Sequence, residues 1–248
     1  MDVLEALEAE SGVVAVVGAG GKKTTLYTLA ARAGDRGTRA VVTATVRIPI
    51  FDPHVESVTV TGDPVAALEE TNSWPAGVVP EREGEDRYVG YEPAVIRDLE
   101  AAGVADLVLV KADGARTREF KAPDEHEPQL PDCVDTVVPI ASVAAVGSPL
   151  SSDLVHRPER VAAITGLEIG ETIRPEDVAR VLASERGGLA DVPDGATVIP
   201  LLNKVDDEKR LAVAREIGTD LLERTPAVSR VVLGRMIDDE TVVDVLEE

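Results

Sequence analysis

Short apolar runs alternate along this chain with longer segments in which apolar residues recur at helical spacing. The continuous run at residues 13–17, bounded by Gly12 and Gly18, suits a strand that is buried on both faces of a parallel sheet. By the same pattern, strands are predicted at residues 13–17, 39–45, 57–60, 106–111, 134–140, 196–202 and 228–233. Helices are predicted at residues 2–9, 24–33, from 64 onward, 92–102, 158–165, 175–184, 208–223 and 240–247.

This alternation of strands and helices predicts an α/β fold, with a mostly parallel sheet that helices cover on both faces. Residues 71–91 are rich in Gly, Pro and charge, and we expect them to form an excursion, such as a β-hairpin, outside the main sheet. The chain has no internal repeat and no low-complexity linker. We therefore expect a single domain over residues 1–248, with room for a small helical lobe around residues 141–192.

The charge balance excludes two classes of partner. Of 248 residues, 46 are acidic and 25 are basic, so the net charge is −21. Binding to nucleic-acid phosphates needs a basic surface, as does binding to an anionic membrane, so neither partner is expected. Hydrophobic residues make up 44% of the chain, which is too much for a disordered acidic protein. Aromatic residues make up only 2%, so the core must consist of Val, Leu, Ile and Ala.

The choice of cations and the cysteine content indicate the environment of the protein. Only 6 of the 25 basic residues are lysine. Many carboxylates with few lysines and aromatics favour a halophilic protein, whose self-repulsion is screened in concentrated salt; an ordinary acidic cytosolic protein is the alternative. The lone Cys133 allows no intrachain disulfide and is expected to be a small buried residue rather than a nucleophile. The N-terminus resembles no signal peptide and no apolar run approaches roughly 18 residues, so we expect a cytoplasmic protein.

The run GAGGKKTT at residues 18–25 is the first candidate for chemistry. It follows the strand at residues 13–17 and opens a helix, which is the context of a phosphate-binding loop. The standard pattern places Gly six positions before the phosphate lysine, and here neither lysine meets every requirement of the pattern. A tight strand–helix turn with incidental lysines is the alternative. The residues expected to contact a nucleotide are Gly18, Gly20, Gly21, Lys22, Lys23, Thr24 and Thr25.

Two further motifs follow apolar strands. Asp113, with Gly114, comes after the apolar strand at residues 107–111. P-loop proteins place a carboxylate near Mg²⁺ and the γ-phosphate in the same position, just after an apolar strand. Thr24 or Thr25 would share the Mg²⁺ with Asp113. At residues 203–206 the sequence NKVD matches a guanine-reading signature of GTPases, in which Asn203, Lys204 and Asp206 would bind the base. For Asp113 and Gly114 the alternative is an ordinary Asp-Gly turn. For residues 203–206 the alternative is a strand end followed by an Asp that caps the next helix.

The loop KAPDEHEP at residues 121–128 is the fourth candidate. It holds one of the three histidines, among carboxylates and between prolines. A histidine in such surroundings can donate a proton, bind a metal or contact an anion. Arg116, Arg118 and Lys121 make this stretch locally basic, which indicates an anionic ligand. A solvated surface loop is the alternative.

These motifs occur in an order that resembles the YqeC family. The segments that carry the resemblance are GAGGKKTT, TATVRIP, ADGARTREFKAPDEHEP, GSPLSSDLVHRPERVAAITGL and LLNKVDD, and it extends roughly over residues 10–235. Proteins of this family are described as accessory proteins for selenium-dependent molybdenum hydroxylases and as selenium cofactor biosynthesis proteins. The family pattern has one lysine followed by Thr or Ser, whereas this chain has two, and an acidic residue is usual where Lys111 stands.

The resemblance implies a P-loop NTPase-like fold and a set of matching site residues, which are Lys22, Asp113, Lys121, His126 and Glu127. We expect an Mg²⁺-dependent NTPase or phosphotransferase that binds GTP or ATP, with Asp113 and His126 in catalytic roles. Its partner would be a molybdenum hydroxylase or the cofactor of that enzyme. A nucleotide-gated chaperone without hydrolysis and a small-molecule kinase are the alternatives.

Overall fold

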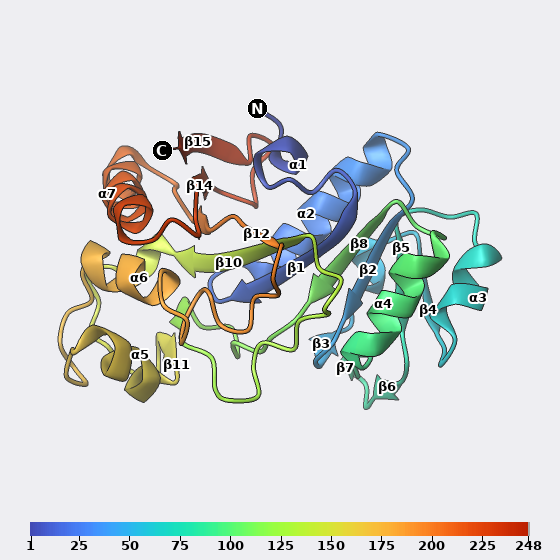
Figure 1. Cartoon of the computed structure of the whole chain (residues 1–248), viewed down its shortest axis with the longest axis horizontal. Coiled ribbons are helices and arrows are strands. Elements are labelled where there is room, and N and C mark those ends of the chain that lie inside the picture. The colour runs from blue at the N-terminus through green and yellow to red at the C-terminus, as the bar shows by residue number, and fades with distance from the viewer. Residues whose placement is uncertain (248) are drawn as a thin grey trace.

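A sheet of ten strands runs through the molecule (Figure 1). The structure is a computed structural model, and it describes residues 1–247. Across the sheet the strands are β15 (Val242–Glu247), β14 (Arg230–Gly234), β13 (Leu201–Asn203), β10 (Thr136–Ser142), β1 (Gly12–Gly18), β8 (Leu107–Lys111), β2 (Ala40–Ala44), β5 (Ala76–Val79) and β4 (Ser57–Val60). A short β12 (Thr197–Val198) also pairs with β10. All these pairs are parallel except β14 with β15, which confirms the predicted α/β fold.

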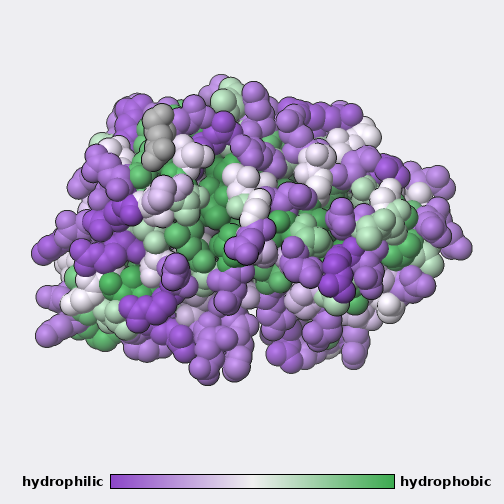
Figure 2. Space-filling model, in the orientation of Figure 1, coloured by the Kyte–Doolittle hydropathy of each residue, from purple (hydrophilic) through white to green (hydrophobic). Residues whose placement is uncertain are grey.

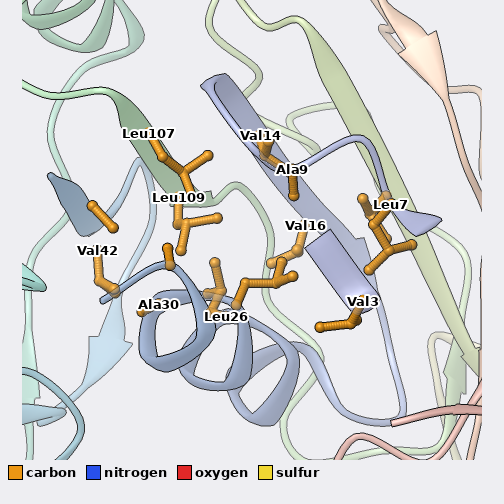
Figure 3. Packing of buried hydrophobic residues seen from close by; sticks show 14 of the residues in the cluster. Val3, Leu7, Ala9, Val14, Val16, Leu26, Ala30, Val42, Leu107 and Leu109 are labelled. Atoms are coloured by element: carbon orange, nitrogen blue, oxygen red, sulfur yellow. The ribbon is translucent and has the colours of Figure 1, made fainter. Parts of the chain in front are cut away.

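Helices cover both faces of the sheet. They are α1 (Val3–Ala6), α2 (Lys22–Asp35), α3 (Pro64–Glu69), α4 (Pro93–Ala102), α5 (Pro158–Thr165), α6 (Pro175–Leu182) and α7 (Glu208–Arg224). On one face, α1 and α2 share an apolar cluster with Val14, Val16, Leu107 and Leu109 (Figure 3). On the other face, α3 and α4 share an apolar cluster with β1 and β8, while α5, α6 and α7 share one with β10, β13 and β14.

Strand β1 shows why the run at residues 13–17 forms the centre of the fold. Successive side chains of a strand point to opposite faces, so Val14 and Val16 enter the cluster with α2, whereas Val13 and Val17 enter the cluster with α4. All five residues of the run are buried. Fully burying a valine side chain is worth about 1.5–3 kcal/mol, so a charge at any of these positions would disrupt the sheet.

The C-terminal segment corrects one prediction. Residues 240–247 were expected to be a helix, but they contain β15, which pairs antiparallel with β14 from Arg230↔Glu247 to Gly234↔Val242. Val242 and Val245 pack on the α2 side, and Val243 and Leu246 pack on the α7 side. Residues three positions apart share a face here because the register shifts between Leu233 and Gly234. The pattern VVDVLE fits both a helix and a strand, and the exposed edge of β14 favours the strand.

Two other segments differ from the prediction in part. Within residues 71–91, β5 joins the main sheet, and only β6 (Arg82–Glu83) and β7 (Arg87–Tyr88) form the expected hairpin, in a small sheet with β3 (Ile48–Pro49). The predicted strand at 196–202 is divided into β12 and β13, because Pro200 between them has no N–H to donate to a neighbouring strand.

Segments near the carboxyl edge of the sheet form a smaller unit with α5 and α6. There β9 (Phe120–Lys121) pairs in parallel with β11 (Val155–His156), which lies beside α5 in Figure 1. One apolar cluster joins this region to the main sheet. The division of the chain into a single domain with a small helical lobe stays a prediction. On the face shown in Figure 2, hydrophilic residues surround a more apolar central area.

Among residues 1–247, no helix combines the length and the apolar character that a membrane crossing demands.

Candidate functional site

Four adjacent parallel strands deliver the predicted motifs to one edge of the sheet. They lie in the order β8–β1–β10–β13, so their carboxyl ends share that edge. From β1 the chain builds the sheet first toward β8, β2 and β4, and then in the other direction toward β10, β13 and β14. Ligands of open parallel sheets bind at such a reversal of strand order, beyond the carboxyl ends.

The turn after β1 is a glycine loop that a side chain would disrupt. Gly18, Gly20 and Gly21 have φ of +85°, +90° and +139°, in the left-handed region that favours glycine. A Cβ at Gly18 would collide with the carbonyl of Ile140, and a Cβ at Gly21 would collide with the amide of Asn203. The loop leads directly into α2, whose first turn carries no acidic residue and no side-chain cap. The positive end of the helix is therefore available to an anion.

Asp113 and Lys22 meet beneath this loop. Lys22 is only 5% exposed, and its Nζ lies 2.8 Å from Asp113 Oδ1 and also donates to the carbonyl of Gly18. Asp113 Oδ2 accepts the N–H of Gly18 at 2.8 Å and lies 2.9 Å from Lys121 Nζ. The Asp113 carboxylate thus joins two buried ammonium groups and the first amide of the glycine loop.

The pKa values at this pair follow from burial and charge. Burial alone would raise the pKa of Asp113, but the charges of Lys22 and Lys121 outweigh it and hold the pKa below its ordinary value. Burial lowers the pKa of Lys22, and the nearby Asp113 opposes this shift without cancelling it. The contact from Lys22 to Asp113 Oδ1 lacks hydrogen-bond alignment, so this oxygen has no hydrogen-bond partner among residues 1–247.

Lys121 extends the cluster into the loop at residues 121–128. Its Nζ donates to Glu127 Oε2 at 2.8 Å and to the carbonyl of Gly114 at 2.7 Å, while Glu127 Oε1 accepts the N–H of Gly114 at 3.1 Å. Arg157 pairs with Glu127 at 2.8 Å and also with Asp124. These bonds fold the segment after β8 back onto the glycine loop, so residues far apart in sequence form one ionic cluster.

Lys111 is a third buried lysine at this edge. It is 6% exposed, and its Nζ donates to the carbonyls of Arg47 at 2.9 Å and Asp113 at 2.7 Å. Within the described chain it forms no salt bridge with a carboxylate. Burial is the main cause, and the charge of Lys22 the next, of a pKa lowered to about 7. Sequence reasoning noted Lys111 only as a departure from the family pattern; a lysine that ends an apolar strand was the available signal.

Asn203 lies against the glycine loop. Its Nδ2 donates to the carbonyl of Gly20 at 2.8 Å, and its Oδ1 accepts the N–H of Met236 at 3.2 Å, so it ties the loop to the segment after β14. Lys204 pairs with Glu119 at 2.7 Å. Asp206 is half exposed and pairs with Arg210 on α7. Of the NKVD motif, Asn203 therefore contacts the glycine loop, whereas Lys204 is paired with Glu119 and Asp206 with a neighbouring helix.

The other predicted residues lie outside the ionic cluster. The Thr25 hydroxyl is buried and donates to the carbonyl of Gly21, whereas Thr24 is exposed and Lys23 half-buried. The side chain of His126 is 84% exposed, with its nearest charged neighbour, Glu125, at 3.9 Å. The catalytic role of His126 stays a prediction. Cys133 is half-buried, which differs from the expected full burial. Burial raises the pKa of its thiol to about 11, which disfavours the nucleophilic thiolate at neutral pH.

The free space at the cluster is small. A cavity of about 20 Å³ lies between Gly18, Asp113, Lys121 and apolar side chains that include Phe120 and Val181. This volume holds about one water molecule. A phosphate group is larger than this cavity, so it could enter the cavity only if the carboxylate or the lysines moved.

Comparison with known proteins gives two findings. The sequence model of a family described as "YqeC protein" matches residues 14–159, a range that includes the glycine loop, Asp113 and the loop at 121–128. "Uncharacterized protein YqeC" of Escherichia coli (strain K12) is 30% identical over 201 residues, which are 77% of this chain and 75% of that protein. The name of this relative states no activity.

Proposed function

The chain belongs to the YqeC family, and we propose that it binds a nucleoside triphosphate with Mg²⁺ at the glycine loop, in the manner of P-loop NTPases. We further propose that binding or turnover serves the maturation of a selenium-dependent molybdenum hydroxylase or of its selenium cofactor. The nucleotide part of the proposal rests on the site. The maturation part rests on the family resemblance.

The observation that carries the proposal is the ion-pair cluster beneath the glycine loop. Lys22, Lys111 and Lys121 are buried there with Asp113, and Arg157 adjoins them through Glu127. Burying three lysines together is unfavourable unless anions compensate them. In a chain with 46 acidic residues, this concentration of lysine at a helix N-terminus favours a ligand with several negative charges, such as the phosphates of a nucleotide.

Asp113 occupies the donors that a phosphate would need. It contacts the Gly18 N–H and the ammonium groups of Lys22 and Lys121, which are the kinds of donor that hold nucleotide phosphates. We propose that a phosphate replaces the Asp113 carboxylate at these donors. Lys22 lies within the cluster and Lys23 does not, which favours Lys22 as the phosphate lysine.

The residues present fit an Mg²⁺ ion. The buried Asp113 Oδ1 faces the Lys22 ammonium at 2.8 Å, and once Lys22 turned to a phosphate this oxygen would be a hard ligand of the kind Mg²⁺ takes. Within residues 1–247 no group of three or more His, Cys, Asp or Glu is placed to hold a metal by itself. Asp113 and the Thr24 hydroxyl would therefore hold Mg²⁺ together with phosphate oxygens and water, and the ion would neutralise charge on the phosphates.

The base would be read beside Asn203. This residue fixes the glycine loop at Gly20 and the segment after β14 at Met236, so a base between these segments would lie next to Lys204. Asp206 would have to leave Arg210 to accept hydrogen bonds from guanine. The proposal therefore assigns Asn203 to positioning the loop, and Lys204 and Asp206 to contacts with the base.

Direct binding and turnover test the proposal. The folded protein in molar KCl is titrated calorimetrically with GTP and with ATP, each with and without Mg²⁺, and phosphate release is followed in parallel. We expect saturable binding that Mg²⁺ strengthens, and loss of the Mg²⁺ effect in Asp113→Asn. Phosphate release would identify an NTPase, and binding without release would favour a nucleotide-gated chaperone. No saturable binding of either nucleotide to folded protein would refute the proposal.

A further inference from the structure

We propose a second anion site, which takes a small tetrahedral oxyanion such as phosphate, on the face where residues 114–119 meet residues 154–157. We call this face the arginine face; it consists of Arg116, Arg118, His156 and Arg157. The inference goes beyond the proposed function, because it assigns a ligand to the side chains of Arg116, Arg118 and His156, which the nucleotide proposal does not use. The face adjoins the glycine loop, since the N–H of Gly20 donates to the carbonyl of Arg118 at 3.0 Å. An oxyanion bound there would lie beside the nucleotide phosphates, where a co-substrate or an acceptor belongs.

Pairing of two short strands builds the arginine face. In the parallel pair β9–β11, Phe120 lies opposite Val155 and Lys121 opposite His156, and the N–H of Glu119 donates to the carbonyl of Leu154 at 2.9 Å. The residues just before β9 therefore lie beside those around the end of β11. Since Lys121 contacts Asp113 at 2.9 Å, its strand partner His156 lies next to the ionic cluster of the glycine loop.

Two arginines of the arginine face, Arg116 and Arg118, are free of carboxylates, whereas Arg157 pairs with Glu127 and Asp124. Acidic residues outnumber basic ones 46 to 25, and many arginines of the chain form ion pairs with them. Arg116 and Arg118 are separated by a single residue, and in the described structure neither has a carboxylate within ion-pair distance. Arg116 is exposed and Arg118 half-buried, so both residues are open to solvent. Guanidinium groups bind oxyanions through two parallel hydrogen bonds.

The backbone of the arginine face adopts a disfavoured conformation at three residues. Among residues 1–247, six residues other than glycine have positive φ, and three of them lie here: Arg116 at +46°, Thr117 at +60° and Arg157 at +61°. A Cβ atom makes the positive-φ conformation unfavourable, so residues other than glycine keep it only where the surrounding structure imposes it. Residues of this kind cluster at binding and catalytic sites, and here they accompany the unpaired arginines.

His156 supplies a neutral group among these cations. Burial, followed by the charges of Arg157, Lys121 and Arg116, lowers its pKa to about 4, and Glu127 opposes the shift. The imidazole is therefore neutral at pH 7 and can donate one hydrogen bond and accept one. Two free guanidinium groups with a neutral imidazole suit an oxyanion that carries a proton or a hydroxyl group, and the anion would offset the local positive charge.

Titration with inorganic phosphate tests the site. The protein is first saturated with Mg²⁺ and a non-hydrolysable GTP analogue, in KCl at a concentration where circular dichroism shows it folded. Phosphate binding is then measured by calorimetry for the wild type and for the double variant Arg116→Ala/Arg118→Ala. The control is Arg82→Ala/Arg186→Ala, which removes two exposed arginines that likewise form no ion pair within residues 1–247. Both double variants change the net charge equally.

We expect the Kd for phosphate to rise about tenfold or more in Arg116→Ala/Arg118→Ala, because two charge-assisted contacts are lost, and to stay within about twofold in the control. Undetectable phosphate binding by the wild type, or a Kd that the double variant leaves within twofold, would overturn the inference. If the analogue itself does not bind, the proposed function fails. The phosphate titration is then run on Lys22→Ala without nucleotide, and its dependence on Arg116 and Arg118 decides the inference separately.

Discussion

Replacing Asp113 by Asn tests whether its carboxylate holds the site together. The side chain is 2% exposed, and its ammonium partners on Lys22 and Lys121 are 5% and 1% exposed, so water screens neither pair. Asn is nearly the same size but carries no charge. In Asp113→Asn, Lys121 would keep Glu127 at 2.8 Å, whereas Lys22 would keep only the carbonyl of Gly18. One buried ammonium would thus lose its only close counter-charge.

Removing one partner of a buried ion pair destabilises a protein by about 3–5 kcal/mol, and we expect a loss of this order for Asp113→Asn. Asp106→Asn is the matched control, since Asp106 precedes the same strand that Asp113 follows. The Asp106–Arg39 pair is 42% and 45% exposed, so its loss should amount to about 0–1 kcal/mol. Urea unfolding of all three proteins in molar KCl at pH 7 measures both values. Equal losses for the two variants would refute the reasoning.

The difference in unfolding free energy between the wild type and Asp113→Asn should depend on pH. The pKa of Asp113 lies below its unfolded value of 3.8, so the carboxylate stabilises the fold fully above about pH 4, and this contribution is lost as the pH falls through the folded pKa. The difference in unfolding free energy between wild type and Asp113→Asn should be constant from about pH 5 to 7 and should shrink below pH 4. A difference that grows on acidification would contradict this assignment.

Three further predictions address salt, Lys111 and the base. Because a net charge of −21 repels itself and salt screens it, the thermal midpoint should be clearly higher in about 3 M than in about 0.1 M KCl; coincident melts would reject the halophilic interpretation. The pKa of Lys111 is about 7 folded against 10.5 unfolded, so the unfolded chain binds more protons between these values and stability rises with pH there, by up to about 1.4 kcal/mol per unit. Lys111→Met should flatten this slope in urea unfolding between about pH 7 and 10, and an unchanged slope would contradict the shift. GTP should bind about tenfold more tightly than ATP in a competition titration, because adenine presents a hydrogen-bond acceptor to the Asp206 carboxylate. Asp206→Asn should favour xanthosine triphosphate. Equal affinities for GTP and ATP would show that residues 203–206 form only a turn at the end of a strand.

The central fold could be predicted because its strands are buried on both faces. Such strands leave continuous apolar runs, and β1, β8 and β4 lie within about one residue of the predicted ranges. The last element could not be assigned in this way. Residues 242–247 present apolar side chains to both faces of a hairpin, and only their pairing with β14, a tertiary contact, decides between helix and strand.

The site was predictable where strand ends determine it. Lys22, Asp113 and Asn203 each follow an apolar strand, and the shared carboxyl edge brings them together. The contacts of Arg157 with Glu127 and Asp124 depend on the pairing of β9 with β11, two strands of two residues each, which leave almost no trace in the sequence. Likewise, no sequence pattern shows that the His126 side chain points into solvent.

Paired nucleotide titrations of Lys22→Ala and Lys23→Ala test the central claim most directly. The two lysines are neighbours in sequence, but only Lys22 is buried against Asp113, while Lys23 is half-buried. A buried charge-assisted contact is worth about 1.5–3 kcal/mol, so Lys22→Ala should weaken Mg²⁺–nucleotide binding roughly 10- to 150-fold, and Lys23→Ala should change it by less than about threefold. Equal and negligible losses in the two variants would remove the glycine loop from the nucleotide site.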